Sequence, residues 1–279
     1  MISLPLSVRL RRAALIALIL GLWAPFKLGW EQHIAREQNL LRYHGVSMTL
    51  QLRDKLGQGM ALGVLSGAGS VVADFFWLNL PTLWEKRQWF KMEGFINIAV
   101  ALQPHSIVFW DIGGWQLAWN ASVGAAHDPA QPNELRRLRD SAFWIDKGLG
   151  VYQRGIENNP GSYKLWADTG LLYQSRLADQ EKRRGLLVDA ARDYKEAGYY
   201  YQQATERSDA PIFLERFPAY MYEDAGDDAD AYKSWVTLWN RLTPTQREMP
   251  QHFKEKMESH IRQLEQKLSI PKEKRVFPN

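Results

Sequence analysis

The chain has 279 residues, of which 46% are hydrophobic and 24% are charged. This is the composition of a folded globular protein, and it argues against a mainly disordered chain. The formal net charge of +4 is small and scattered, and the sequence has no recognisable nucleic-acid-binding module, so we expect no nucleic-acid partner. The chain contains no cysteine, which excludes disulfides, thiolate metal sites and cysteine nucleophiles.

The first thirty residues predict a membrane anchor. Three arginines between residues 9 and 12 precede an uncharged apolar run, residues 13–26. Lys27 can extend toward the interface, so residues 13–30 approach the roughly 20 residues that cross a bilayer core. We interpret 13–30 as an uncleaved transmembrane signal anchor. The alternatives are a cleaved signal peptide, for which no good small-x-small site is present, and a buried soluble helix, which would rarely begin with three arginines.

The arginines also predict the orientation of this anchor. Basic flanks stay in the cytoplasm, so residues 1–12 are expected there and the rest of the chain outside. In a Gram-negative bacterium this means a single-pass protein of the inner (cytoplasmic) membrane, with its C-terminal part in the periplasm. Residues 31–71 then form a juxtamembrane helical region.

A second uncharged stretch covers residues 60–73. Gly59, Gly63 and Gly67 recur at four-residue spacing, which places them on one helical face and predicts close packing against another helix. A second membrane span is the alternative, although Asp74 would then lie inside it, where a carboxylate is costly. The glycines do not form a phosphate-binding loop, because no Lys followed by Ser or Thr completes that motif.

The most informative pattern in the sequence is a repeat. The segments 104–114 and 160–170 both read P-x5-W-x3-G, and helical spacing places the tryptophan, the glycine and the next apolar residue on one face. We expect the glycine to let a neighbouring helix cross closely and the aromatic ring to fill the gap beside it. The predicted packing positions are Trp110, Gly114 and Leu117 in the first copy and Trp166, Gly170 and Tyr173 in the second.

These residues resemble the tetratricopeptide repeat, a 34-residue helix-turn-helix whose first helix carries W-x2-L-G-x2-Y. Second-helix positions of such units are matched by Met92, Ile96 and Ala99, by Gly148, Tyr152 and Gly155, by Ala197, Tyr201 and Ala204, and more loosely by Ala231, Trp235 and Leu238. The resemblance covers residues 72–242 and implies an all-α, tetratricopeptide-like solenoid of helical hairpins.

The sequence departs from the tetratricopeptide pattern in two respects. Extra residues lie near 125–137, where 56 rather than 34 residues separate Pro104 from Pro160, and again near 178–185. The leucine before the glycine is missing in both of the best copies. Beyond the repeats, residues 243–270 are predicted to contain a capping helix, because apolar residues recur every three or four positions from Phe253 to Leu268. Residues 271–279 form a basic tail that we expect to be mobile.

The search for chemistry finds no complete motif. There is no G-x-S-x-G, H-E-x-x-H or nucleotide-binding loop. His33 and Glu37 lack a third metal ligand, and the acidic run at residues 223–230 lacks the order of a calcium loop. We therefore predict that the chain is not an enzyme and has no catalytic residue, cofactor, metal or small-molecule substrate.

The predicted function is that of a membrane-anchored scaffold or adaptor that binds one or more protein partners of an envelope complex. The inner faces of the first helices would make the contact, with Asp111, Trp115 and Asn120 as candidate partner-binding residues. One alternative is an accessory structural subunit of a membrane complex. Another is an envelope enzyme acting on glycans or lipids, which a pocket with two close carboxylates of raised pKa would support.

Overall fold

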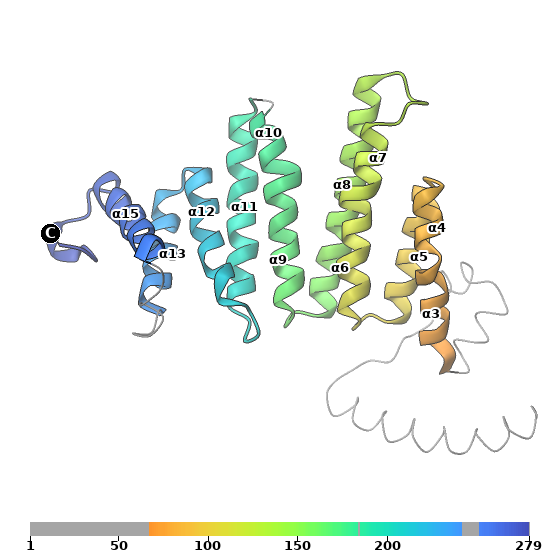
Figure 1. Ribbon diagram of the computed structural model, residues 1–279, viewed down its shortest axis with the longest axis horizontal. Coiled ribbons are helices and arrows are strands. Elements are labelled where there is room, and N and C mark those ends of the chain that lie inside the picture. The colour runs from red at the N-terminus through yellow and green to blue at the C-terminus, as the bar shows by residue number, and fades with distance from the viewer. Residues whose placement is uncertain (1–66, 184, 242–250, 279) are drawn as a thin grey trace, which may run out of the picture. The chain divides into compact units, whose positions relative to one another are not determined.

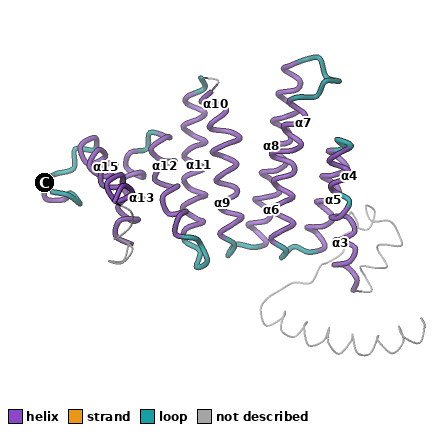
Figure 2. The backbone as a smooth tube through the Cα atoms, viewed as in Figure 1, coloured by secondary structure: helices purple, strands orange, loops and turns teal. Residues whose placement is uncertain are grey.

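The computed structural model describes residues 67–183, 185–241 and 251–278, all of which belong to one compact unit, residues 51–279. The described residues are all-helical and contain no strand (Figure 1, Figure 2). The predicted all-α class is therefore confirmed for this part. The α-helices are α3 (Gly69–Leu78), α4 (Leu80–Glu85), α5 (Trp89–Leu102), α6 (Ile107–Trp115), α7 (Ser122–Ala126), α8 (Glu134–Asn158), α9 (Tyr163–Leu172), α10 (Asp179–Arg183), α11 (Leu187–Thr205), α12 (Phe217–Ala225), α13 (Asp228–Arg241) and α15 (Gln251–Lys267).

Two short π-helical segments interrupt the regular helices. Segment η2 (Gln116–Ala121) joins α6 to α7, and η3 (Tyr173–Ala178) joins α9 to α10. The elements α6, η2 and α7 therefore form one long rod, and so do α9, η3 and α10, each rod with a π-helical turn in its middle. Two 3₁₀ segments, η4 (Ile212–Arg216) and η5 (Lys272–Lys274), complete the described elements.

Local sequence signals account for several helix ends. Asn133 caps α8, because its side-chain oxygen accepts a hydrogen bond from the backbone N–H of Arg136 at 3.0 Å. Pro218 lies in the first turn of α12, where its missing N–H costs nothing. Gly226 ends the same helix with φ 74°, a left-handed conformation that glycine adopts without strain.

Successive helices pack as antiparallel neighbours. Gly155 of α8 lies against Trp110 of α6, while Gly148 lies against Ala118, so residue numbers rise along one helix and fall along the other. The pair α9 and α11 follows the same rule, since Trp166 contacts Tyr200 whereas Asp179 accepts a hydrogen bond from Tyr194. The first helices α6 and α9 are parallel to each other: Asp111 pairs with Lys164 and Ser122 with Arg176.

The core lies between these neighbours. The second-helix positions identified in the sequence are buried or nearly so, among them Met92, Ile96, Tyr152, Ala197, Tyr201 and Trp235. A C-terminal cluster joins α12, α13 and α15 around Trp235, Met257 and Ile261. Helix α15 covers residues 251–267 of the amphipathic segment predicted to end the repeats.

The C-terminal tail differs from the expectation of mobility. Val276 and Phe277 pack against the cluster of α13 and α15, and the Phe277 ring lies 5.0 Å from that of Trp239. The buried carboxylate of Glu265 accepts a hydrogen bond from the Val276 backbone N–H at 2.6 Å. Two hydrophobic side chains among the basic residues thus fix the tail to the last helix.

The predicted membrane segments fall mostly outside the described residues. None of the helices within 67–183, 185–241 and 251–278 combines the length and apolarity needed to cross a bilayer. The anchor predicted at 13–30 lies outside these ranges, as do Gly59 and Gly63. Gly67 is described and has φ 86°, so it does not continue a regular right-handed helix face toward α3.

Candidate functional site

The repeated motif produces the same hydrogen bond in both copies. The indole Nε1 of Trp110 donates to the carbonyl oxygen of Pro104 at 2.7 Å, and that of Trp166 donates to Pro160 at 3.1 Å. Each bond joins residues six positions apart around the start of a helix. It therefore fixes how α6 and α9 leave the preceding turn, which a spacing of P-x5-W makes possible.

The motif glycines lie where a tyrosine of the second helix crosses. A Cβ on Gly114 would lie 2.7 Å from the ring of Tyr152, and one on Gly170 would lie 3.1 Å from the ring of Tyr201. These distances leave little or no room for a side chain. Two further motif positions also pack inside the helical array: Leu117 is fully buried, and Tyr173 stacks on Tyr200 with ring centres 5.3 Å apart.

The two π-helical segments contact each other through an arginine. Arg176 in η3 donates from Nε to the carbonyl oxygen of Ala118 in η2 at 3.1 Å, and from Nη2 to the hydroxyl of Ser122 at 2.7 Å. A π-helical turn disturbs the ordinary ladder of backbone hydrogen bonds, so its carbonyl groups can accept from side chains. The arginine thereby couples the middle of one rod to the middle of the next.

Near the start of these rods, two carboxylates share one lysine. Lys164 Nζ lies 3.0 Å from an Asp111 carboxylate oxygen and 2.9 Å from an Asp168 oxygen. The pKa of Asp168 is raised to about 7, mainly by burial and also by the neighbouring charge of Asp111, while Lys164 acts in the opposite direction. The three groups form a bridge between α6 and α9, and one of them can change its charge near neutral pH.

The hydroxyl of Tyr152 lies close to this bridge. It is buried and forms no hydrogen bond with any residue that the structure describes. Burial, together with the charges of Asp168 and Asp111, raises the pKa of Tyr152, so the phenol stays protonated at neutral pH. The equivalent Tyr201 differs, because its hydroxyl donates to the Gln174 side chain at 3.0 Å.

The three residues predicted to bind a partner all lie on α6 and η2. Asp111 is occupied by the ion pair with Lys164. Trp115 is 42% exposed and stacks on Trp119, with ring centres 4.3 Å apart and planes 8° from parallel. Asn120 is half-buried and donates from Nδ2 to the Gln116 side chain at 2.7 Å. Of the three, Trp115 presents the largest apolar surface to solvent.

Trp115 belongs to a longer apolar surface that was not predicted from the sequence. On the rod formed by α6, η2 and α7, exposed or half-buried apolar side chains recur at spacings of four, three, four and four residues. This surface, called the α6 ridge below, consists of Val108, Ile112, Trp115, Trp119 and Val123. The spacing was visible in the sequence, but it is the same spacing that a buried helix face would show. Whether this surface is exposed depends on which other elements pack against the helix, and the sequence of the helix alone does not show that.

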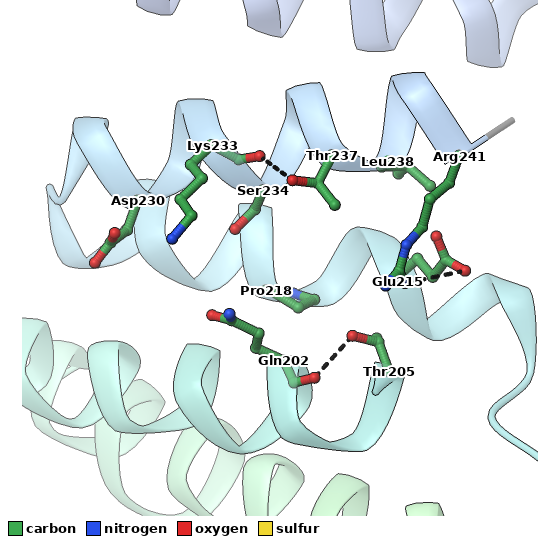
Figure 3. Close-up of a pocket in the computed structure, with 10 residues that line it drawn as sticks. All are labelled: Gln202, Thr205, Glu215, Pro218, Asp230, Lys233, Ser234, Thr237, Leu238 and Arg241. Atoms are coloured by element: carbon green, nitrogen blue, oxygen red, sulfur yellow. Dashed lines mark hydrogen bonds and ion pairs between the residues drawn. The ribbon is translucent and has the colours of Figure 1, made fainter. Parts of the chain in front are cut away.

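A separate small cavity lies between α11, the η4–α12 junction and α13 (Figure 3). It is lined by Gln202, Thr205, Glu215, Pro218, Asp230, Lys233, Ser234, Thr237, Leu238 and Arg241. Its charges are two acids and two bases, and Arg241 lies 3.8 Å from Glu215. None of the predicted partner-binding residues lines this cavity, and neither does Asp168.

The polar groups outside the bridge are largely engaged with one another. In the acidic run before α13, Glu223 accepts a hydrogen bond from the Trp235 indole at 2.8 Å, and Asp228 pairs with Lys267 at 2.6 Å. Within 67–183, 185–241 and 251–278 no group of three or more His, Asp or Glu side chains is arranged to hold a metal ion. His33 and Glu37 lie outside these ranges.

Comparison with known proteins gives no relative from which a role could be transferred. No family model, curated protein or solved structure matches the chain. A functional proposal for this chain therefore rests on the arrangement of its own residues.

Proposed function

We propose that this chain is a membrane-anchored, tetratricopeptide-like helical solenoid that binds a protein partner along the α6 ridge, as a scaffold in the bacterial cell envelope. Support for the repeat architecture comes from the two equivalent tryptophan–proline hydrogen bonds and the two glycine–tyrosine contacts. Support for the anchor comes from the apolar run at residues 13–30 behind its arginines.

The observation that carries the binding proposal is the exposure of the α6 ridge. Ile112 and Trp115 stand on adjacent turns of one helix and are 39% and 42% exposed, and Val108 and Val123 extend the same exposed apolar stripe. An apolar stripe with tryptophan near its centre is typical of a surface that accepts the apolar face of a partner helix. The neighbouring bridge of Asp111, Lys164 and Asp168 supplies a polar rim.

A catalytic role has less support at this surface. Asp111 and Asp168 are close, and the pKa of Asp168 is about 7, which are two properties of a carboxylate pair in an enzyme. However, Lys164 bridges both carboxylates, and neither lines the cavity of Figure 3. A satisfied bridge between two helices is what a structural network provides, so we propose binding and not catalysis.

Site-specific photocrosslinking tests the binding proposal. A benzophenone amino acid placed at Trp115 in living cells is expected to yield a discrete crosslinked product. The same probe at Phe213, an exposed aromatic residue of η4, serves as the control and should yield none. Ile112→Asp should abolish the product while leaving the melting temperature close to that of the wild type. Equal products from both positions, or none from Trp115, would reject the ridge as the binding surface.

The anchor and its topology require a separate test. Because the chain has no cysteine, Gly45→Cys and Gln180→Cys each create a unique labelling site. We expect both to react with an impermeant maleimide added from outside. Labelling at 45 with protection at 180 would mean that the segment between them crosses the membrane and that the repeats face the cytoplasm. Recovery of the protein in the soluble fraction would reject the anchor.

A further inference from the structure

Two connections between first and second helices are longer than the repeat pattern requires. One is the loop from α7 to α8, among the extra residues near 125–137, and the other is the end of the second rod, where α10 takes up most of the extra residues near 178–185 before the chain turns into α11. Because α6 and α9 are parallel, the connections that follow them lie at the same end of the helices. Figure 1 shows both at the upper end of the helices.

Both connections end in exposed apolar side chains. Leu135, in the first turn of α8, is 78% exposed, and Leu138 follows one turn later. In the second connection three consecutive apolar residues are exposed: Leu186, Leu187 at 66% and Val188 at 85%. Three consecutive exposed apolar residues lower the solubility of a protein, because each side chain would be more stable out of water. Such a run therefore indicates a surface that contacts something other than water.

Positive charge accompanies these apolar residues. Arg136 and Arg139 are exposed beside Leu135 and Leu138, and they form no ion pair with any residue that the structure describes. Lys182, one turn before Leu186, is exposed but pairs with Asp224 at 3.2 Å. We name Leu135, Leu138, Leu187 and Val188 together with Arg136 and Arg139 the extended edge.

The acidic groups near the extended edge are mostly directed elsewhere. In the second connection, Asp179 is half-buried and accepts a hydrogen bond from the Tyr194 hydroxyl of α11. Asp189 pairs with Arg192 at 3.1 Å. Glu134 remains exposed in the first turn of α8, where a carboxylate also stabilises the helix N-terminus. The exposed charge beside Leu135 and Leu138 is therefore mainly positive, since Arg136 and Arg139 face only Glu134 there.

We infer that the extended edge docks onto an anionic lipid surface. Leucine and valine at the tips of two separate connections match a broad, flat apolar layer better than the groove of a single protein, which would require a continuous stripe. The arginines beside Leu135 and Leu138 match anionic headgroups. Insertion of exposed leucines into the boundary between headgroups and acyl chains adds the apolar contribution. This inference rests on residues that the partner-binding proposal does not use.

The test uses full-length protein with one introduced cysteine. Leu135→Cys and Leu187→Cys place an environment-sensitive nitrobenzoxadiazole label on each connection. Gly161→Cys places it in the exposed turn between α8 and α9, at the opposite end of the helices, where an added Cβ meets nothing within 4 Å. Each protein is mixed with vesicles of phosphatidylcholine alone or with added phosphatidylglycerol, and quenching by lipids spin-labelled in the upper acyl chain is measured.

We expect strong quenching at positions 135 and 187 with anionic vesicles, weaker quenching with neutral vesicles and none at 161. Arg136→Glu combined with Arg139→Glu should shift the ratio of docked to undocked protein by about tenfold or more, because each basic residue contributes about 1 kcal/mol. The inference would be overturned if the labels at 135 and 187 remained exposed to water, or if quenching at 161 equalled the quenching at 135 and 187. So would shielding of position 187 in native membranes but not in pure lipid vesicles, which would assign the edge to an acidic protein.

This test also separates the inference from the proposed function. Binding to neutral vesicles reports the N-terminal anchor, whereas the difference between anionic and neutral vesicles in quenching at 135 and 187 reports the edge. A failed crosslink at Trp115 leaves both readings unchanged.

Discussion

Gly148 of α8 lies directly against the backbone of Ala118 in η2. A Cβ on this glycine would come within 2.7 Å of the Ala118 amide nitrogen and 2.8 Å of the Gly114 carbonyl oxygen. The π-helical segment and the second helix therefore approach closely enough to exclude even a methyl group. Since backbone atoms form the contact, no side-chain rotation can relieve it.

Gly148→Ala is accordingly expected to lower the free energy of unfolding by about 1–3 kcal/mol, the usual cost of overpacking. Gly150→Ala in the same helix is the matched control, because an added Cβ there meets nothing within 4 Å. It should be neutral or stabilise by up to about 1 kcal/mol through helix propensity. Urea denaturation of both full-length variants gives the comparison. Equal effects would mean that the close approach does not exist.

Two equivalent tyrosines should respond differently to loss of their hydroxyl. Tyr152→Phe removes a buried group that has no described partner, so stability should stay the same or rise by about 1 kcal/mol. Tyr201→Phe removes the bond to Gln174 and should cost about 1 kcal/mol. The two melting temperatures should therefore move apart. A clear loss of stability in the Tyr152 variant would reveal a partner for its hydroxyl.

The tryptophan–proline bond can be tested at the second copy of the motif. Trp166→Phe keeps an aromatic ring but loses the donor to Pro160, and we expect a loss of about 1 kcal/mol in the free energy of unfolding. Trp115→Phe is the control, because its indole donates to no residue that the structure describes. Its stability should remain within about 0.5 kcal/mol of the wild type, as for most surface substitutions. Similar losses in both variants would argue that ring size, and not the bond, matters.

The bridge between α6 and α9 should make stability depend on pH. The folded pKa of Asp168, about 7, lies above its ordinary value of 3.8, so the folded chain binds the proton more tightly. The stabilisation that this provides is complete below about pH 4 and is lost as the pH rises through 7. Between pH 5 and pH 8 we expect a loss of about 1–3 kcal/mol from this group, given 1.36 kcal/mol for each pKa unit.

Asp168→Asn should remove that part of the pH dependence, whatever its effect on stability at a single pH. Thermal unfolding across pH 5–8 measures the slope for each protein. Asp209→Asn, in an exposed loop, should retain the slope of the wild type. Parallel profiles for the wild type and the Asp168 variant would show that this carboxyl titrates outside the range.

The sequence predicts the buried faces well, because helical spacing determines which residues share a face. Helical spacing predicts Leu117 on such a face, the resemblance to the tetratricopeptide repeat predicts Tyr152 and Trp235 as packing positions, and all three are buried. The helix predicted near the C-terminus is likewise present as α15. A period of three to four residues specifies a stripe, and packing of successive stripes supplies the core.

The sequence predicts the site less completely, because its parts come from different helices. Lys164 contacts Asp111 only because α8 returns the chain so that α9 lies beside α6. A single sequence does not reveal that contact. Ile112 has the spacing of a core residue but lies on an uncovered face. The π-helical segments leave no clear signal either, since they reflect the packing of Arg176 and Ala118 across two rods.

The two π-helical segments also bear on how the chain tolerates changes in length. Each begins within three residues of its motif glycine, at residue 116 in one rod and at residue 173 in the other. A π-helical turn holds one more residue than the ordinary turn that could replace it. Deletion of a single residue inside either segment can therefore be absorbed by reversion to a regular helix, whereas the same deletion inside α8 would rotate every following side chain by about 100°. The irregular turns are thus the positions in these rods where the chain can shorten without losing its fold.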